Sequence, residues 1–200
     1  MMEKAPDWLI NEMPPGYQTR AAEIQRLSAE LDAMDRIGWL LWQTGQPLKD
    51  AVRDMFTALR YETEVQSDAA SYDVGVTLDA NRRLFVRVSK TDGVIGKKSP
   101  DLVAVFQTLS EVAGDHDRVV LAANNHLETR PLDRPASDDI APDALDLLQR
   151  IGANILTPAT LFRIWSLSLK EDVNRARAHV ERLHAQNGGE FQLPSPPNPS

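Results

Sequence analysis

The chain contains no cysteine among its 200 residues. This absence excludes disulfide bonds, zinc sites and iron–sulfur clusters with cysteine ligands, and thiol nucleophiles. No apolar run approaches the roughly 18 residues that a membrane-spanning helix needs. The first 17 residues also lack the apolar core of a signal peptide. We therefore expect a cytoplasmic protein without a membrane contact.

Positive charge is also scarce, since 22 Lys and Arg residues face 29 Asp and Glu residues and the net charge is −7. A surface of this sign opposes tight, non-specific binding of a polyanion. Basic residues are nevertheless concentrated between positions 82 and 98, where one acid accompanies Arg82, Arg83, Arg87, Lys90, Lys97 and Lys98. This segment could bind a phosphate backbone or an acidic protein face. The alternative is that these residues are only solvated strand ends.

Hydrophobic periodicity predicts an α/β domain with helices at both ends. Residues 18–43 carry apolar side chains at three- and four-residue steps, which predicts an amphipathic helix that packs across its own domain or joins two copies of the chain. Further helices are predicted at 48–59, 100–112, 144–151, from 158 onward and at 171–186, and strands at 63–66, 73–79, 83–90, 118–123 and 154–156. We expect a loose segment (1–16), an N-terminal amphipathic helix (17–44), an α/β domain (45–187) and a disordered proline-rich tail (188–200).

The strands predicted at 73–79 and 83–90 are joined by a short polar turn of hairpin length. A helix precedes this hairpin, and a second helix leads from it to RVVLAA, a run typical of a strand buried on both faces. The order of these elements, with the stretches GQPLKDAV, VRVSKTDG, LAANN and LTPATLF, resembles bacterial members of the restriction-endonuclease-like (PD-(D/E)XK) superfamily. The resemblance covers roughly residues 45–186. It implies a restriction-endonuclease-like mixed sheet flanked by helices.

Hydrolysis in that superfamily uses a divalent metal ion held by acidic side chains, with a lysine nearby. Asp73 matches the first acid, but Arg87 and Ser89 stand where the second acid and the lysine are expected. Lys49 stands where relatives often carry a glutamate. Because side chains alternate along a strand, Lys90 points away from the face of Arg87 and Ser89. The resemblance thus implies a degenerate site without a metal or cofactor, in which Asp73 pairs with Arg87 or the cations accept an anion.

Three functions follow from these features. The first is a catalytically inactive domain that acts as a protein-interaction or regulatory module in a larger assembly. The second is a nucleic-acid-binding protein without catalysis, and the third is a metal-dependent nuclease with a rearranged site built from Asp73, Asp79 and Glu64. Asn124 and Asn125 follow the strand at 118–123, where ligands often bind in α/β sheets. The candidate residues for binding an anion or a partner are Arg82, Arg83, Lys97, Lys98, Asn124 and Asn125.

Overall fold

The computed structural model describes residues 12–66, 71–90, 93–123, 129 and 140–194. The contact pattern divides the chain into two compact units, Met1–Asp35 and Arg36–Ser200. The first unit contains most of helix α2 (Tyr17–Gly38), and the second contains the last turn of this helix and an α/β domain. Within the described ranges, no helix combines the length and the apolar character needed to cross a membrane.

Six strands form one mixed sheet in which the spatial order follows the sequence. The antiparallel part consists of β1 (Glu62–Val65), β2 (Val74–Thr77) and β3 (Arg83–Val88). The parallel part continues from β3 with β4 (Arg118–Ala122), β5 (Asn154–Leu156) and β6 (Gly189–Glu190). Because β3 has a neighbour on each side and a helical layer on each face, four of its six residues are buried.

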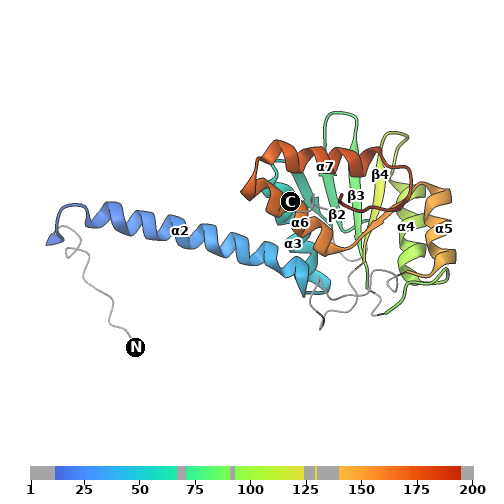
Figure 1. The fold of residues 1–200 in the computed structure, drawn as a ribbon, viewed down its shortest axis with the longest axis horizontal. Coiled ribbons are helices and arrows are strands. Elements are labelled where there is room, and N and C mark those ends of the chain that lie inside the picture. The colour runs from blue at the N-terminus through green and yellow to red at the C-terminus, as the bar shows by residue number, and fades with distance from the viewer. Residues whose placement is uncertain (1–11, 67–70, 91–92, 124–128, 130–139, 195–200) are drawn as a thin grey trace, which may run out of the picture. The chain divides into compact units, whose positions relative to one another are not determined.

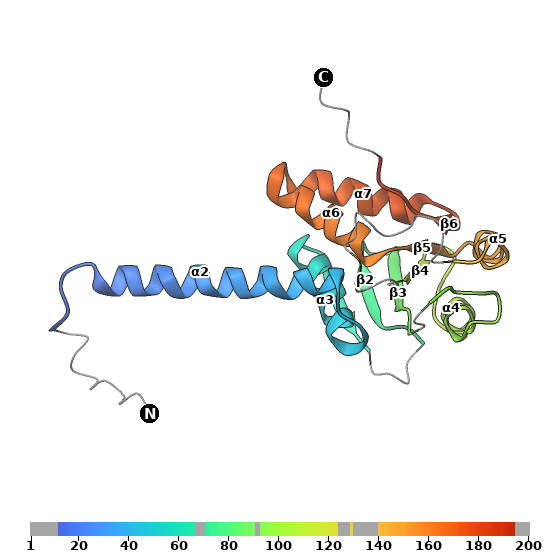
Figure 2. The ribbon, with the colours of Figure 1, turned by 60° about the horizontal axis from the view of Figure 1, so that its bottom comes forward.

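Helices lie on both faces of the sheet, as Figures 1 and 2 show. On one face, α4 (Pro100–Glu111) and α5 (Pro142–Ile151) cover a core that contains Phe85, Leu121 and Ile155. The alternate residues of the same strands face α3 (Gly45–Ala58), α6 (Pro158–Lys170) and α7 (Val173–Ala185). The predicted α/β class and the mixed sheet flanked by helices are therefore present.

Capping residues fix several helix boundaries where the sequence predicts them. At the start of α4, the Ser99 hydroxyl accepts a hydrogen bond from the Asp101 N–H, and Pro100 occupies the first helical position. At the end of α5, Gly152 adopts the left-handed conformation with φ of 72°. The helix predicted at 18–43 instead ends at Gly38, and a 3-10 turn, η1 (Trp39–Leu41), follows it.

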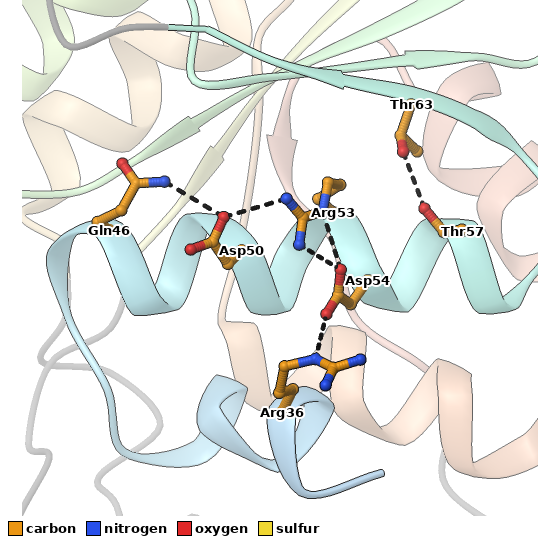
Figure 3. Close-up of polar contacts among 7 residues, drawn as sticks. All are labelled: Arg36, Gln46, Asp50, Arg53, Asp54, Thr57 and Thr63. Carbon is orange, nitrogen blue, oxygen red and sulfur yellow. Dashed lines mark hydrogen bonds and ion pairs between the residues drawn. The ribbon is translucent and has the colours of Figure 1, made fainter. Parts of the chain in front are cut away.

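Helix α3 presents a polar face outward, and ion pairs link this face to the end of α2 (Figure 3). Arg53 lies 3.3 Å from Asp50 and 2.7 Å from Asp54, and Arg36 lies 3.0 Å from the same Asp54 carboxylate. The opposite face of α3 is buried in the domain and carries Leu48, Lys49, Ala51, Val52, Met55 and Phe56. One lysine therefore points inward with the apolar side chains.

The C-terminal end differs from the prediction of a disordered tail from residue 188. Gly189 and Glu190 form β6 beside β5, and Phe191 is buried. Two consecutive glycines usually end a regular element, which is why the sequence predicts a break here. In the structure, Gly188 and Gly189 have φ values of 85° and 92°, a conformation that residues with side chains rarely adopt. The Asn154 side chain accepts the Gly188 N–H at 2.9 Å and holds this turn against the sheet. Tertiary contacts thus override local propensity here.

Candidate functional site

The predicted site residues meet where α3 and the β2–β3 hairpin pack together. Asp73 directly precedes β2, and its N–H donates to the Val86 carbonyl of β3 at 3.0 Å. Lys49 comes from the buried face of α3, and Arg87 lies near the end of β3. These three residues, which are far apart in the sequence, are brought together by the packing of α3 across the antiparallel part of the sheet.

Lys49 is the closest charged partner of Asp73. Its Nζ lies 2.9 Å from Asp73 Oδ1, and each side chain is only 2% exposed. The other carboxylate oxygen, Oδ2, accepts the Val88 N–H at 2.8 Å. Burial of an unpaired charge is costly, so each of the two charged groups depends on the other. Both oxygens of the Asp73 carboxylate are occupied by donors of the protein itself.

The ion pair between Asp73 and Arg87 that the sequence predicts is also present, but it is the longer of the two. Arg87 Nε lies 3.7 Å from Asp73 Oδ2, and the Arg87 side chain is 12% exposed. Sequence reasoning named Lys49 as a changed position but assigned the pairing to Arg87. The geometry gives the shorter contact to Lys49, because α3 is the element that covers Asp73.

Ser89 belongs to a second polar cluster, centred on Asp101 in the first turn of α4. Its hydroxyl donates to Asp101 Oδ2 at 3.0 Å, and the Lys90 N–H donates to Oδ1 at the same distance. Asp101 is buried, whereas the Lys90 side chain is exposed, in agreement with the predicted alternation. Sequence reasoning missed Asp101. Its one signal was an acid in a first helical turn, where the helix dipole favours negative charge.

The acids considered for a rearranged nuclease site do not gather around Asp73. Asp79 follows the far end of β2 and pairs with Arg82 at 2.7 Å. Glu64 lies on β1 and accepts a hydrogen bond from the Tyr72 hydroxyl. Across the described ranges, no group of three or more His, Cys, Asp or Glu side chains has an arrangement that would hold a metal ion.

The basic segment 82–98 is divided between the two ends of β3. Arg82 and Arg83 lie at its start, and Arg82 pairs with Asp79 at 2.7 Å and with Glu181 of α7 at 2.8 Å. Lys97 and Lys98 are exposed and lie beyond its other end, just before α4. A six-residue strand is about 20 Å long, so these residues do not form one patch. Asn124 and Asn125 lie outside the described residues.

The structure contains the hairpin, the helix after it and the following strand that the sequence predicts. β2 and β3 are antiparallel, α4 follows them, and β4 pairs with β3 in parallel. Searches of protein-family models, of curated proteins and of solved structures find no match to this chain.

Proposed function

We propose that this chain is a catalytically inactive, restriction-endonuclease-like domain that acts as a protein-interaction or regulatory module in a larger assembly. The observation that carries the proposal is the 2.9 Å contact between Lys49 Nζ and Asp73 Oδ1 in a buried environment. An ammonium group thus contacts the carboxylate that would have to bind a catalytic metal ion. The Lys49 ammonium supplies a positive charge beside Asp73. Unlike a metal ion, however, an ammonium group cannot coordinate a water molecule and activate it.

The other site residues support the same conclusion. Arg87 adds a second cation within 3.7 Å of Asp73, so the surroundings of this carboxylate repel a divalent cation. Ser89, at the position expected for a lysine, donates to Asp101. The side chains that would carry hydrolysis are thus engaged with one another, and they stabilise the packing of α3 and α4 against the hairpin.

Helix α2 carries the features of a protein-contacting element. Ile24, Leu27 and Leu31 are spaced by three and four residues and are 67%, 49% and 58% exposed. Apolar side chains in this spacing are covered when two helices pair through a common seam. We propose that α2 of a second copy of the chain packs against these residues.

Light scattering after size-exclusion chromatography tests this contact. We expect a dimer for the unmodified protein and a monomer for Leu27→Glu/Leu31→Glu, because two charges then enter the seam. The matched control is Ala22→Glu/Ala29→Glu, which adds the same charge at exposed positions on the opposite side of the helix. A monomer at every concentration of the unmodified protein would contradict dimerisation through α2 and leave the proposed catalytic silence untouched.

Affinity recovery of the tagged protein from its native cell extract tests the interaction module as a whole. We expect another protein to be recovered in a fixed ratio with the chain, and this ratio to survive nuclease treatment of the extract. Recovery of nucleic acid alone, lost after nuclease treatment, would contradict the proposal and favour the second candidate function.

That second candidate, non-catalytic binding of nucleic acid, rests on Arg83, Lys97 and Lys98, which are exposed basic residues. If about four phosphates are contacted, the logarithm of affinity should fall against the logarithm of salt concentration with a slope near −3.6. Replacement of Arg82, Arg83, Lys97 and Lys98 by glutamine should then flatten that slope. We expect no measurable duplex binding near physiological salt, because the net charge of −7 opposes a polyanion and because Arg82 is already paired with two acids.

A further inference from the structure

A pocket of about 550 Å³ lies between α6, α7 and the segment that follows β6. Its position is independent of the Asp73 site, since none of its lining residues comes from α3 or the β2–β3 hairpin. Pockets that hold small molecules in proteins commonly measure about 300–1,000 Å³. The volume is therefore that of a small-molecule site and too small for a folded partner.

The helical period explains why α6 can form both the core and this pocket. Leu161, Ile164 and Trp165 are buried in the domain. Phe162, Ser166 and Lys170 are spaced by four residues, lie on another side of the helix and line the pocket. Helix α7 begins after a two-residue link, with Asp172 as its N-cap, so its first turns lie beside the end of α6. Residues 193 and 194 close a further side.

The pocket wall is mainly apolar. Its apolar side chains are Phe162, Leu167, Leu193 and Pro194, and Phe162 contacts Trp165 at a ring-centroid distance of 5.3 Å. The Ser166 hydroxyl donates to the Phe162 carbonyl within α6 at 2.9 Å. An apolar body would therefore find hydrophobic contacts along the length of this pocket.

Two cations line the same pocket without a counter-charge. Among the described residues, no carboxylate lies within ion-pair distance of Arg163 or Lys170. The third cation, Arg175, is paired with Glu171 at 2.6 Å. Burial and the neighbouring Arg182 and Arg175 lower the pKa of His179, which favours its neutral form. A net positive charge thus remains at an apolar pocket on a chain of net charge −7.

We propose that this pocket binds a small amphiphilic anion, a molecule with an apolar body and one carboxylate or sulfonate group. The body lies against Phe162, Leu167 and Leu193, and the anionic group lies between Arg163 and Lys170. An apolar pocket with a few convergent polar groups is the usual construction of a ligand site. The charges set the sign of the ligand, because a cation of the same shape would meet two like charges and no free carboxylate.

Decanoate is a suitable probe, with decylamine as the probe of opposite charge and equal length. We expect titration calorimetry of the full chain to show saturable decanoate binding and at least tenfold weaker decylamine binding. Amide chemical shifts should change mainly at residues 162–170 and 175–179. Equal affinity for both probes, or shift changes confined to another region, would overturn the proposal.

Variants separate the two parts of the site. Arg163→Gln/Lys170→Gln should weaken decanoate binding at least tenfold, whereas Arg20→Gln/Arg150→Gln, which removes the same charge from exposed positions elsewhere, should leave it unchanged. Ser166→Trp should abolish binding by filling the pocket, with the melting temperature checked to confirm folding. Unchanged decanoate affinity in Arg163→Gln/Lys170→Gln, or in a folded Ser166→Trp, would contradict the assignment. Binding of an acidic, leucine-containing peptide without any binding of decanoate would also contradict the assignment, because the pocket would then bind a peptide and not a small amphiphilic anion.

Discussion

Two pairs of basic residues in the α/β domain are in opposite electrostatic situations. Lys49 and Arg87 lie beside the buried Asp73 carboxylate, at 2.9 and 3.7 Å. Arg163 and Lys170 line an open pocket whose one acid among the described lining residues, Glu171, is already paired with Arg175. The first pair is used for structure and the second is available to a ligand. The position of the nearest carboxylate therefore decides whether a cation stabilises the fold or can bind a ligand.

The energetic consequences of removing these cations differ for the same reason. In a buried ion pair, the attraction between the two charges offsets the free energy lost when both are removed from water. The net contribution of the pair to stability is therefore small. Breaking it is nevertheless costly because one charge is left alone in a dry interior. A solvated cation pays no such penalty when it is removed. Stability and ligand binding should therefore separate cleanly between the two regions.

The largest effect is expected for Asp73→Asn. The amide still accepts the Val88 N–H, but Lys49 loses its counter-charge in a site that is 2% exposed. The free energy of unfolding should fall by about 3–5 kcal/mol, measured by urea denaturation. The control is Lys49→Met/Asp73→Asn, which should recover most of this loss, because no charge remains at the 2% exposed position of Lys49, and Arg87, which also loses Asp73, reaches solvent. Equal instability of the single and double variants would show that the ion pair is not the cause.

Arg87→Gln should have a smaller effect than Lys49→Met. Arg87 makes the longer contact, at 3.7 Å, and its side chain reaches solvent, whereas loss of the Lys49 ammonium leaves Asp73 with its more distant partner alone. We expect a loss of about 1–2 kcal/mol for Arg87→Gln and about 3 kcal/mol or more for Lys49→Met. The reverse order in urea denaturation would make Arg87 the principal partner, as the sequence alone suggested.

His184 of α7 is a buried base that has no carboxylate in ion-pair contact within the part of the chain that the structure describes. Its Nε2 donates to the His116 carbonyl at 2.9 Å, and burial lowers its pKa below the ordinary value of 6.5. The unfolded chain therefore takes up this proton first, so stability is complete above the unfolded pKa and falls as the pH drops below it. The slope is at most about 1.4 kcal/mol per pH unit for one proton. His184→Gln should lose this slope below about pH 6.5 in urea denaturation at a series of pH values, whereas His116→Gln, at an exposed position, should keep it.

The smallest effect on stability is expected for Arg163→Gln/Lys170→Gln. Both side chains are exposed at the pocket and no described carboxylate pairs with them. The free energy of unfolding should change by less than about 0.5 kcal/mol, while the decanoate affinity falls. A loss of stability comparable to that of Asp73→Asn would mean that these cations are structural after all, and the contrast between the two regions would disappear.

Much of the fold could be predicted because its signals are local. The run RVVLAA, the Ser99 cap and the αL glycine at position 152 each specify a boundary within a few residues. The two residues of β6 could not be found this way, since they form a strand only because β5 and the Asn154 side chain hold them.

The members of the Asp73 site were predictable, but neither their contacts nor the role of Asp101 was. Asp73, Lys49 and Arg87 could be named from their positions in the predicted helix and in the hairpin that follows it. The choice of Lys49 as the nearer partner depends on how α3 crosses the sheet, and the contact of Ser89 with Asp101 depends on where α4 begins relative to β3. The α6–α7 pocket likewise requires a helix pair and a distant segment, which no local pattern specifies.

A cleavage assay tests most directly whether Lys49 and Arg87 have replaced the catalytic metal. Pure full-length protein is incubated with supercoiled plasmid, linear duplex DNA and single-stranded RNA in magnesium or manganese, beside an Asp73→Ala preparation purified in the same way. We predict that neither preparation cleaves any substrate, because an ammonium and a guanidinium group flank the carboxylate that would hold the metal ion. Metal-dependent cleavage by the unmodified protein that is lost in Asp73→Ala would contradict this prediction.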